Sequence, residues 1–303
     1  MRKFCCICCT LMVFVLVSAC AQTPDDIDPD PAVSTPVKAP KKIYRYGFEI
    51  DARTIGYTLL VNGAEMSVFE GGNGKVTSAS TVINDWMISG NNEIAVNIFW
   101  PDGLKFTPGA GSGVFRFFVN DTQIKEYRWP LAEVPENTNS YTINDTFKAE
   151  GFPRVLIERA ERVISSTGAL PQSDQEEIAA LAEQVRQAFT EKDISRIDSL
   201  FEFKYADLAA ARFTTAAAVR AEMDAQFREI MEKEAYAVRP FSYYGRYGYF
   251  STADDRVVRL VQGRIGFPEP VLVITYRNEA RRTARYDLDL YFVKIDGKWI
   301  IIR

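Results

Sequence analysis

The chain has 303 residues, of which 47% are hydrophobic and 25% charged, and its formal net charge is -4. These proportions are typical of a folded globular protein and exclude a disordered chain, and the length allows two ordinary domains. The acidic balance argues against nucleic-acid binding, which needs a concentrated basic surface.

Histidine is absent from the sequence. It is the commonest general acid or base near neutral pH and the commonest metal ligand. A Ser-His-Asp hydrolase, a HExxH metalloprotease and a three-histidine zinc centre are therefore excluded. We expect neither a metal nor another cofactor, so any catalysis would depend on carboxylates or tyrosines.

The first segment, residues 1–19, has the order of a secretory signal peptide. Arg2 and Lys3 are followed by an apolar run over residues 11–17 and then by small residues. The segment 17–20, Val-Ser-Ala-Cys, resembles the lipobox of bacterial lipoproteins. The resemblance implies a diacylglyceryl thioether on Cys20, usually with a further N-acyl chain. Two or more acyl chains anchor a protein stably to a membrane.

The alternative is an ordinary signal peptide cut near Ala19 or Ala21, which would leave Cys20 as a free thiol or remove it. In Gram-negative lipoproteins the residues after the lipidated cysteine help to sort the protein. Here the pair 21–22, Ala-Gln, lacks the aspartate typical of inner-membrane retention. We therefore expect the protein at the periplasmic face of the outer membrane. The other four cysteines lie within the signal, so the mature body should contain no disulfide.

Residues 20–42 are predicted to be a flexible linker behind the lipid anchor. They are rich in proline and charge and lack apolar periodicity. Such a segment stays extended and holds the folded body away from the membrane surface.

Residues 43–150 are predicted to form an all-β antiparallel sandwich. Apolar and polar residues alternate in short runs separated by turn residues. The pair Asn62-Gly63 is the strongest of these turn signals, because both central residues of a type I′ hairpin need a positive φ. The expected strands are 43–50, 55–61, 66–69, 75–83, 93–100, 113–120 and 123–129.

Two patches of this domain, Leu60-Val61-Asn62-Gly63 and Gly90-Asn91-Asn92-Glu93-Ile94, are similar to galactose-binding jelly rolls. The resemblance implies a fold more than a ligand. Trp86 and Trp100, with Tyr244 of the second domain, are the candidate ligand-binding residues, because sugar rings stack on aromatic planes. Trp129 is a further aromatic of the first domain that could be exposed. The alternative, which the high aromatic content favours, is that the tryptophans fill the core.

Residues 151–172 form a junction, and residues 173–303 are predicted to be an α+β domain. Ser173 and Glu176 fit a capping box at the start of the first helix. Further helices are expected from Asp193 and over 215–235, followed by strands at 239–250, 256–265, 271–276, 285–295 and 298–303. Asp296-Gly297 should join the last two strands as a tight hairpin.

The segments 191–201 and 290–302 resemble the helix and the closing DGKW hairpin of the nuclear-transport-factor-2-like superfamily. The resemblance implies helices packed on a curved antiparallel sheet around a cone-shaped apolar pocket. The superfamily includes isomerases, dehydratases and many binding, dimerising or accessory domains, so the fold does not give the function. A homodimer through the C-terminal sheet is a further expectation.

Asp287, Asp289 and Tyr291 are the candidate catalytic residues, because alternate residues of one strand share a face. An aspartate with a tyrosine donor could move a proton next to a carbonyl. In the alternative, which ordinary amphipathic alternation favours, both aspartates face solvent while Leu288 and Leu290 face the core.

The leading hypothesis is a membrane-anchored periplasmic lipoprotein that acts as a non-enzymatic binding or accessory module. Its partner would be an envelope protein or a glycan. The alternatives are an isomerase- or dehydratase-like enzyme in the C-terminal cone and carbohydrate binding by the sandwich.

Overall fold

The structure is a computed structural model that describes residues 43–100, 111–130, 138–149, 156–164, 169–241, 247–252, 255–264 and 267–302. The predicted signal and linker, with Cys20, lie outside these residues, and so does Tyr244. Within the described ranges, none of the helices is long and apolar enough to cross a membrane.

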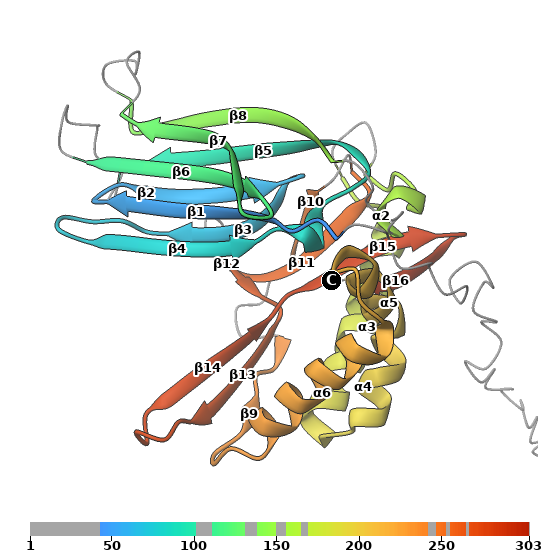
Figure 1. The fold of residues 1–303 in the computed structure, drawn as a ribbon. Coiled ribbons are helices and arrows are strands. Elements are labelled where there is room, and N and C mark those ends of the chain that lie inside the picture. The colour runs from blue at the N-terminus through green and yellow to red at the C-terminus, as the bar shows by residue number, and fades with distance from the viewer. Residues whose placement is uncertain are drawn as a thin grey trace, which may run out of the picture. The chain divides into compact units, whose positions relative to one another are not determined.

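The first part of the chain consists of antiparallel strands in two sheets, with the orders β4-β1-β6-β7 and β3-β2-β5-β8 (Figure 1, blue to green). The strands are β1 (Tyr46–Arg53), β2 (Gly56–Val61), β3 (Ala64–Phe69), β4 (Val76–Val82), β5 (Gly90–Phe99), β6 (Ser112–Val119), β7 (Thr122–Trp129) and β8 (Ser140–Ala149), with a 3-10 turn η1 (Asn84–Trp86). Alternate side chains are buried between the sheets, and the rings of Tyr57 and Phe115 meet edge-on with centroids 5.5 Å apart. This arrangement agrees with the sandwich-like first part predicted from the sequence.

Both hairpins predicted from local turn signals are present. Asn62 and Gly63 have φ angles of 48° and 78° between β2 and β3. Asp296 and Gly297 have φ angles of 50° and 75° between the last two strands. Asparagine, aspartate and glycine adopt this left-handed region at low cost, which is why the signal is reliable.

Asn62 and Asn92, from the two patches that resemble jelly rolls, are buried and hydrogen-bonded to each other. The Asn62 amide donates to Asn92 Oδ1 at 2.9 Å and to the Trp86 carbonyl at 2.7 Å. Its oxygen accepts from the Glu93 amide at 2.9 Å, and Asn92 accepts from the Ile88 amide at 2.8 Å. These asparagines satisfy backbone groups inside the protein, which is a structural role.

The second part combines helices with two antiparallel sheets. One has five strands, in the order β10-β11-β15-β16 with β12 paired to β11, and the other has three, in the order β14-β13-β9. The helices are α2 (Leu156–Arg159), α3 (Gln172–Glu191), α4 (Ile194–Leu200), α5 (Glu202–Ala211) and α6 (Ala216–Met231). The strands are β9 (Ala237–Val238), β10 (Tyr247–Thr252), β11 (Val257–Arg264), β12 (Phe267–Pro270), β13 (Leu272–Arg277), β14 (Thr283–Leu288), β15 (Leu290–Ile295) and β16 (Lys298–Ile302). The α+β character of this part is therefore as predicted.

Two of the helices begin at side-chain caps close to the expected positions. Asp193 accepts a hydrogen bond from the Arg196 amide at 3.0 Å, and Thr215 accepts one from the Ala218 amide at 3.2 Å. These bonds satisfy amides that have no partner within a helix. Helices and strands then enclose an apolar cluster whose largest side chains include Phe189, Phe201, Phe227 and Phe292.

The capping box predicted at Ser173 is wrong. Helix α3 begins at Gln172, and Pro171 is its N-cap without a side-chain bond. Asp174, in the first turn of α3, is 6% exposed and accepts hydrogen bonds from Lys294 Nζ at 2.7 Å and Trp299 Nε1 at 3.0 Å. A long-range ion pair therefore sets the position of this helix end.

Two strand predictions also need correction. The strand expected over residues 285–295 is interrupted at Asp289, where β14 ends and β15 begins; β14 pairs with β13, whereas β15 pairs with β11 and β16. Strand β8 is missing from the strands expected within the sandwich range 43–150. It pairs with β5 along ten residue pairs, so this long-range pairing determines its structure.

The two parts share one hydrophobic core cluster. Beside the sandwich residues it contains Ala211, Val257, Tyr291, Val293 and Ile302. Polar bonds connect the same parts. The Asn84 amide donates to the Ala211 carbonyl at 3.2 Å, and Arg212 donates to both carboxylate oxygens of Asp85, at 2.9 and 2.8 Å. The domain boundaries expected from the sequence stay predictions.

Candidate functional site

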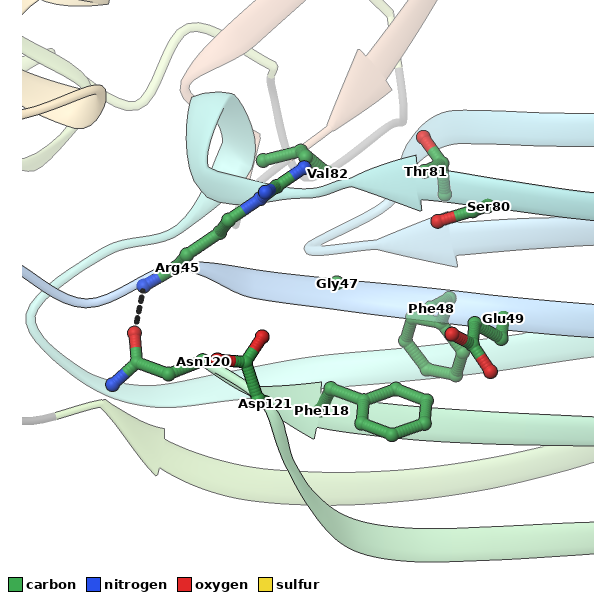
Figure 2. A pocket seen from close by; sticks show the side chains of 10 residues that line it. All are labelled: Arg45, Gly47, Phe48, Glu49, Ser80, Thr81, Val82, Phe118, Asn120 and Asp121. Carbon is green, nitrogen blue, oxygen red and sulfur yellow. Dashed lines mark hydrogen bonds between the residues drawn. The ribbon is translucent and has the colours of Figure 1, made fainter.

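The outer face of the β4-β1-β6-β7 sheet carries a hollow at Gly47. This residue lies between Val82 of β4 and Phe118 of β6 in the strand register. Since glycine has no side chain, the space above it stays open, and a Cβ there would lie 3.1 Å from the Thr81 carbonyl oxygen. The hollow has a volume of about 300 Å³ and is lined by Arg45, Gly47, Phe48, Glu49, Ser80, Thr81, Val82, Phe118, Asn120 and Asp121 (Figure 2).

The hollow combines an apolar floor with a charged rim. Val82 is 45% exposed and Phe118 is half-buried, so both present apolar surface. Figure 2 shows the Arg45 side chain reaching toward Val82, while Asp121 lies on the other side of β1 near Phe118. Binding sites for small molecules typically pair apolar surface with a few placed polar groups.

The rim is held in place by two hydrogen bonds between Arg45, the residue before β1, and Asn120 in the β6–β7 turn. The Arg45 amide donates to Asn120 Oδ1 at 2.9 Å, and the Asn120 amide donates to the Arg45 carbonyl at 2.6 Å. Asn120 has a φ of 53°, a conformation that asparagine tolerates well. This clamp fixes Asp121, the next residue in the turn, at the edge of the hollow.

The charged groups of the rim differ from their neighbours in how they are paired. In the adjacent rows of the sheet, Arg116 bonds to Asp51 at 2.8 Å and to Glu126 at 3.3 Å. The hydrogen bond from Arg116 lowers the pKa of Asp51. Glu49 lies opposite Arg116 in register, yet Arg116 turns away from it. Across the described ranges, no side-chain ion pair or hydrogen bond engages Arg45, Glu49 or Asp121.

No family model matches the chain, and the searches of curated proteins and of solved structures likewise gave no match. The chemistry of the hollow therefore has to be inferred from its own residues. A carboxylate accepts hydrogen bonds from hydroxyls, a guanidinium donates them, and an aromatic ring offers a flat apolar surface. The arrangement is suited to a small polar ligand that has one apolar face.

The tryptophans expected to bind a ligand lie elsewhere. Trp86 is 5% exposed and packs against Tyr291 with ring centroids 4.4 Å apart. Trp129 is equally buried, and Trp100 is half-buried against the same core. The core-packing alternative therefore describes Trp86 and Trp129 better. The hollow is lined by Phe118, which is half-buried, and by Phe48, which is 1% exposed; no sequence motif indicated either residue.

Of the three candidate catalytic residues, Asp289 and Tyr291 lie near each other, because Arg259 bonds to Asp289 and its guanidinium lies 5.8 Å from the Tyr291 ring centroid, whereas Asp287 bonds to Arg285. Asp287 pairs with Arg285 and keeps 41% of its side chain exposed. Asp289 accepts from Arg259 Nε at 3.0 Å at the break between β14 and β15. Tyr291 belongs to the core shared with the sandwich rather than to the cone's apolar cluster, and burial raises its pKa.

Asp289 instead contributes to a second polar cluster, around a buried lysine. Lys204 is 4% exposed, and its ammonium lies 5.5 Å from the Phe201 ring centroid. Burial lowers the pKa of Lys204 to about 8, although the negative charges of Asp85 and Asp289 act in the opposite direction. The lysine carries its charge in a poorly solvated place, which costs stability at neutral pH.

A third cluster joins helices α4, α5 and α6. Tyr205 donates to Asp198 at 3.0 Å, and Arg220 also bonds to Asp198. Asp224 lies close by; burial and the neighbouring Asp198 carboxylate raise its pKa. Within the described residues, Asp224 Oδ1 has no hydrogen-bond partner.

These clusters do not include a metal centre. Among the described residues, there is no group of three Asp, Glu, Cys or His side chains spaced to hold an ion. All three clusters depend on contacts between different helices or strands, so no local motif could have predicted them. The hollow at Gly47 is distinguished from the other two by its accessible apolar floor.

Proposed function

We propose that this chain is a lipid-anchored protein of the bacterial cell envelope, at the periplasmic face of the outer membrane, and acts as a non-enzymatic binding module. The sequence from Arg2 to Cys20 supports the anchor. The hollow at Gly47 supports the binding role, and its ligand is a glycan. The observation that carries the proposal is a rim of charged side chains, unpaired among the residues that the structure describes, beside the half-buried Phe118.

A sugar ring fits this combination of groups. Its C–H face packs on the plane of an aromatic ring, here Phe118, with Val82 extending the apolar floor. Its hydroxyls donate to the Glu49 and Asp121 carboxylates and accept from Arg45, and such charge-assisted hydrogen bonds are stronger than neutral ones. The space left by Gly47 allows the ring to approach the sheet.

The finer fold assignments belong to the same proposal. We assign residues 173–303 to the nuclear-transport-factor-2-like superfamily, and helices α3–α6 packed with strands around one apolar cluster support that assignment. The first part would be a jelly roll of the galactose-binding type, supported by the joined Asn62 and Asn92 patches. An isomerase or dehydratase has less support, because Asp287 is 41% exposed and Tyr291 belongs to the core shared with the sandwich.

Binding of envelope oligosaccharides and soluble peptidoglycan fragments, measured on an array and then by calorimetry, tests the ligand. Phe118→Ala and Glu49→Gln should each lower the affinity at least tenfold. Val68→Ala and Glu70→Gln are matched controls, because both residues are exposed and lie outside the hollow. Equal affinity of Phe118→Ala and the wild type, or binding of none of these glycans, would refute the glycan proposal.

The anchor is tested separately by metabolic labelling with a radioactive fatty acid. Cys20→Ser should abolish the label and block maturation. A Cys20→Ser protein that still carries the label would disprove lipidation at this residue.

A further inference from the structure

Strand β4 is an edge of its sheet and lacks the usual features that protect an edge. In the described part of the chain it pairs only with β1, in one continuous register from Gly47↔Val82 to Arg53↔Val76. Its seven residues include no charge, no proline and no bulge, the features by which sheet edges avoid pairing with other chains. Its two ends are among the most exposed large apolar residues, Val76 at 67% and Val82 at 45%.

The sequence of this strand reads the same in both directions. It is Val-Thr-Ser-Ala-Ser-Thr-Val, with Ala79 at its centre. When a second copy lies antiparallel about Ala79, every residue meets its own kind: alanine faces alanine, each serine faces a serine, each threonine a threonine and each valine a valine. Matched hydroxyl and β-branched pairs are favourable across strands, and no like charges are opposed.

We propose that β4 is a homodimer interface, in which two copies pair antiparallel about Ala79 and join their sheets into one continuous sheet of eight strands. A two-fold interface uses the same surface on both copies and must therefore be self-complementary. The palindrome gives this property, whereas binding of an unrelated peptide would not require it. The interface differs from the dimer through the C-terminal sheet that the sequence resemblance predicted.

The proposed pairing would also enlarge each hollow. Ser80 and Val82 of β4 line the hollow at Gly47. In this register the serine and valine at positions 78 and 76 of the second copy lie directly beside them. Both hollows would open on the same face of the joined sheet, so a glycan with repeating units could occupy both. The dimer itself does not rest on the glycan proposal.

Cysteine cross-linking of the full-length protein in cell envelopes tests the register. Opposite residues of antiparallel strands have Cα atoms about 4.5–5.5 Å apart, within the range that a disulfide spans. Ala79→Cys should therefore give a covalent dimer on mild oxidation. Thr77→Cys alone should not, because the two cysteines would be offset by four residues, about 13 Å along the strand. The double variant Thr77→Cys/Thr81→Cys should cross-link again, and the wild type controls for its own cysteines.

Sedimentation of the purified full-length protein in detergent gives an independent readout. The wild type should show a concentration-dependent dimer, and Val76→Lys should weaken it at least tenfold because it places a charge at the exposed edge. Three results would overturn the proposal: no dimer from Ala79→Cys, equal yields from the Ala79→Cys and Thr77→Cys single variants, or cross-linking of Ala79→Cys to a different protein.

Discussion

Replacing the buried Lys204 by methionine should stabilise the protein. Lys204 is 4% exposed, and methionine has a similar length without the charge. The nearby carboxylates retain other cations, since Arg212 bonds to Asp85 and Arg259 to Asp289. Buried charges replaced by apolar groups of similar volume are often neutral or stabilising.

The size of the effect follows from the pKa of Lys204. The difference between the ordinary value of 10.5 and the value of about 8 in the folded protein is 10.5 − 8, or about 2.5. A difference of one in pKa between the folded and unfolded states corresponds to about 1.4 kcal/mol, so the charged lysine costs the folded state about 3 kcal/mol at neutral pH. Lys204→Met should therefore raise the free energy of unfolding by about 3 kcal/mol at pH 7.

The gain should depend on pH in a defined direction. Between pH 8 and 10.5 the unfolded chain keeps the lysine proton that the folded chain has lost. The stability contributed by this residue therefore rises with pH across that window in the wild type. The variant has no such group, so its advantage should shrink toward zero near pH 10.5. Buried tyrosines titrate in both proteins, so they cancel in the difference.

Urea unfolding of both proteins at pH 7 and at pH 10.5 measures these differences. Lys148→Met, at an exposed position on β8, is the control and should change stability little at either pH. A Lys204→Met protein that is less stable than the wild type at pH 7 would refute the reasoning. A gain that is the same at both pH values would also refute it, because the effect would then not come from the charge.

Three further predictions concern other side chains. Asp174→Ala should lower the free energy of unfolding by about 2 kcal/mol, because it leaves the Lys294 ammonium and the Trp299 N–H without their acceptor. Burial raises the pKa of Asp174, but these hydrogen bonds outweigh burial and lower the pKa overall. The wild type should therefore lose this stabilisation as the pH falls below about 4, whereas the variant, which lacks the carboxylate, should not. Urea unfolding of both proteins at pH 7 and pH 3 checks both expectations. Asp224→Asn should raise the Tm at pH 7, because burial and the neighbouring carboxylate raise the pKa of Asp224 and make its ionised form unfavourable; a lower Tm would contradict this. Gly47→Val should fill the hollow and abolish glycan binding on the array while the circular-dichroism spectrum stays that of the wild type; full binding by this variant would place the ligand elsewhere.

Local signals in the sequence predicted the parts of the fold that depend on a few adjacent residues. The turns at Asn62-Gly63 and Asp296-Gly297 formed because their φ angles follow from residue type. The cap at Asp193 is equally local. Long-range contacts decided the rest. Hydrogen bonds from Lys294 and Trp299 to Asp174 hold the start of α3. A change of pairing partners at Asp289 divides one predicted strand into two.

The candidate site was less predictable than the fold. Its floor depends on Gly47 lying between Val82 and Phe118, which are brought together only by the pairing of three strands. Glycine in a strand is a weak signal by itself, since it can also mark a bulge or a close approach of backbones. The tryptophans were an ambiguous signal, because large aromatic residues fill cores as readily as they line binding sites, and Trp86 and Trp129 are buried.

The core that both parts share has a consequence for how the protein is made. Strands β1–β8 precede Tyr291, Val293 and Ile302 in the chain, and these three residues complete the apolar cluster that both parts share. Until β15 and β16 are in place, the apolar surface of the sandwich that these strands cover stays exposed to solvent. Chaperones should therefore hold this chain longer than one whose first domain folds alone, and fragments truncated before residue 290 should aggregate.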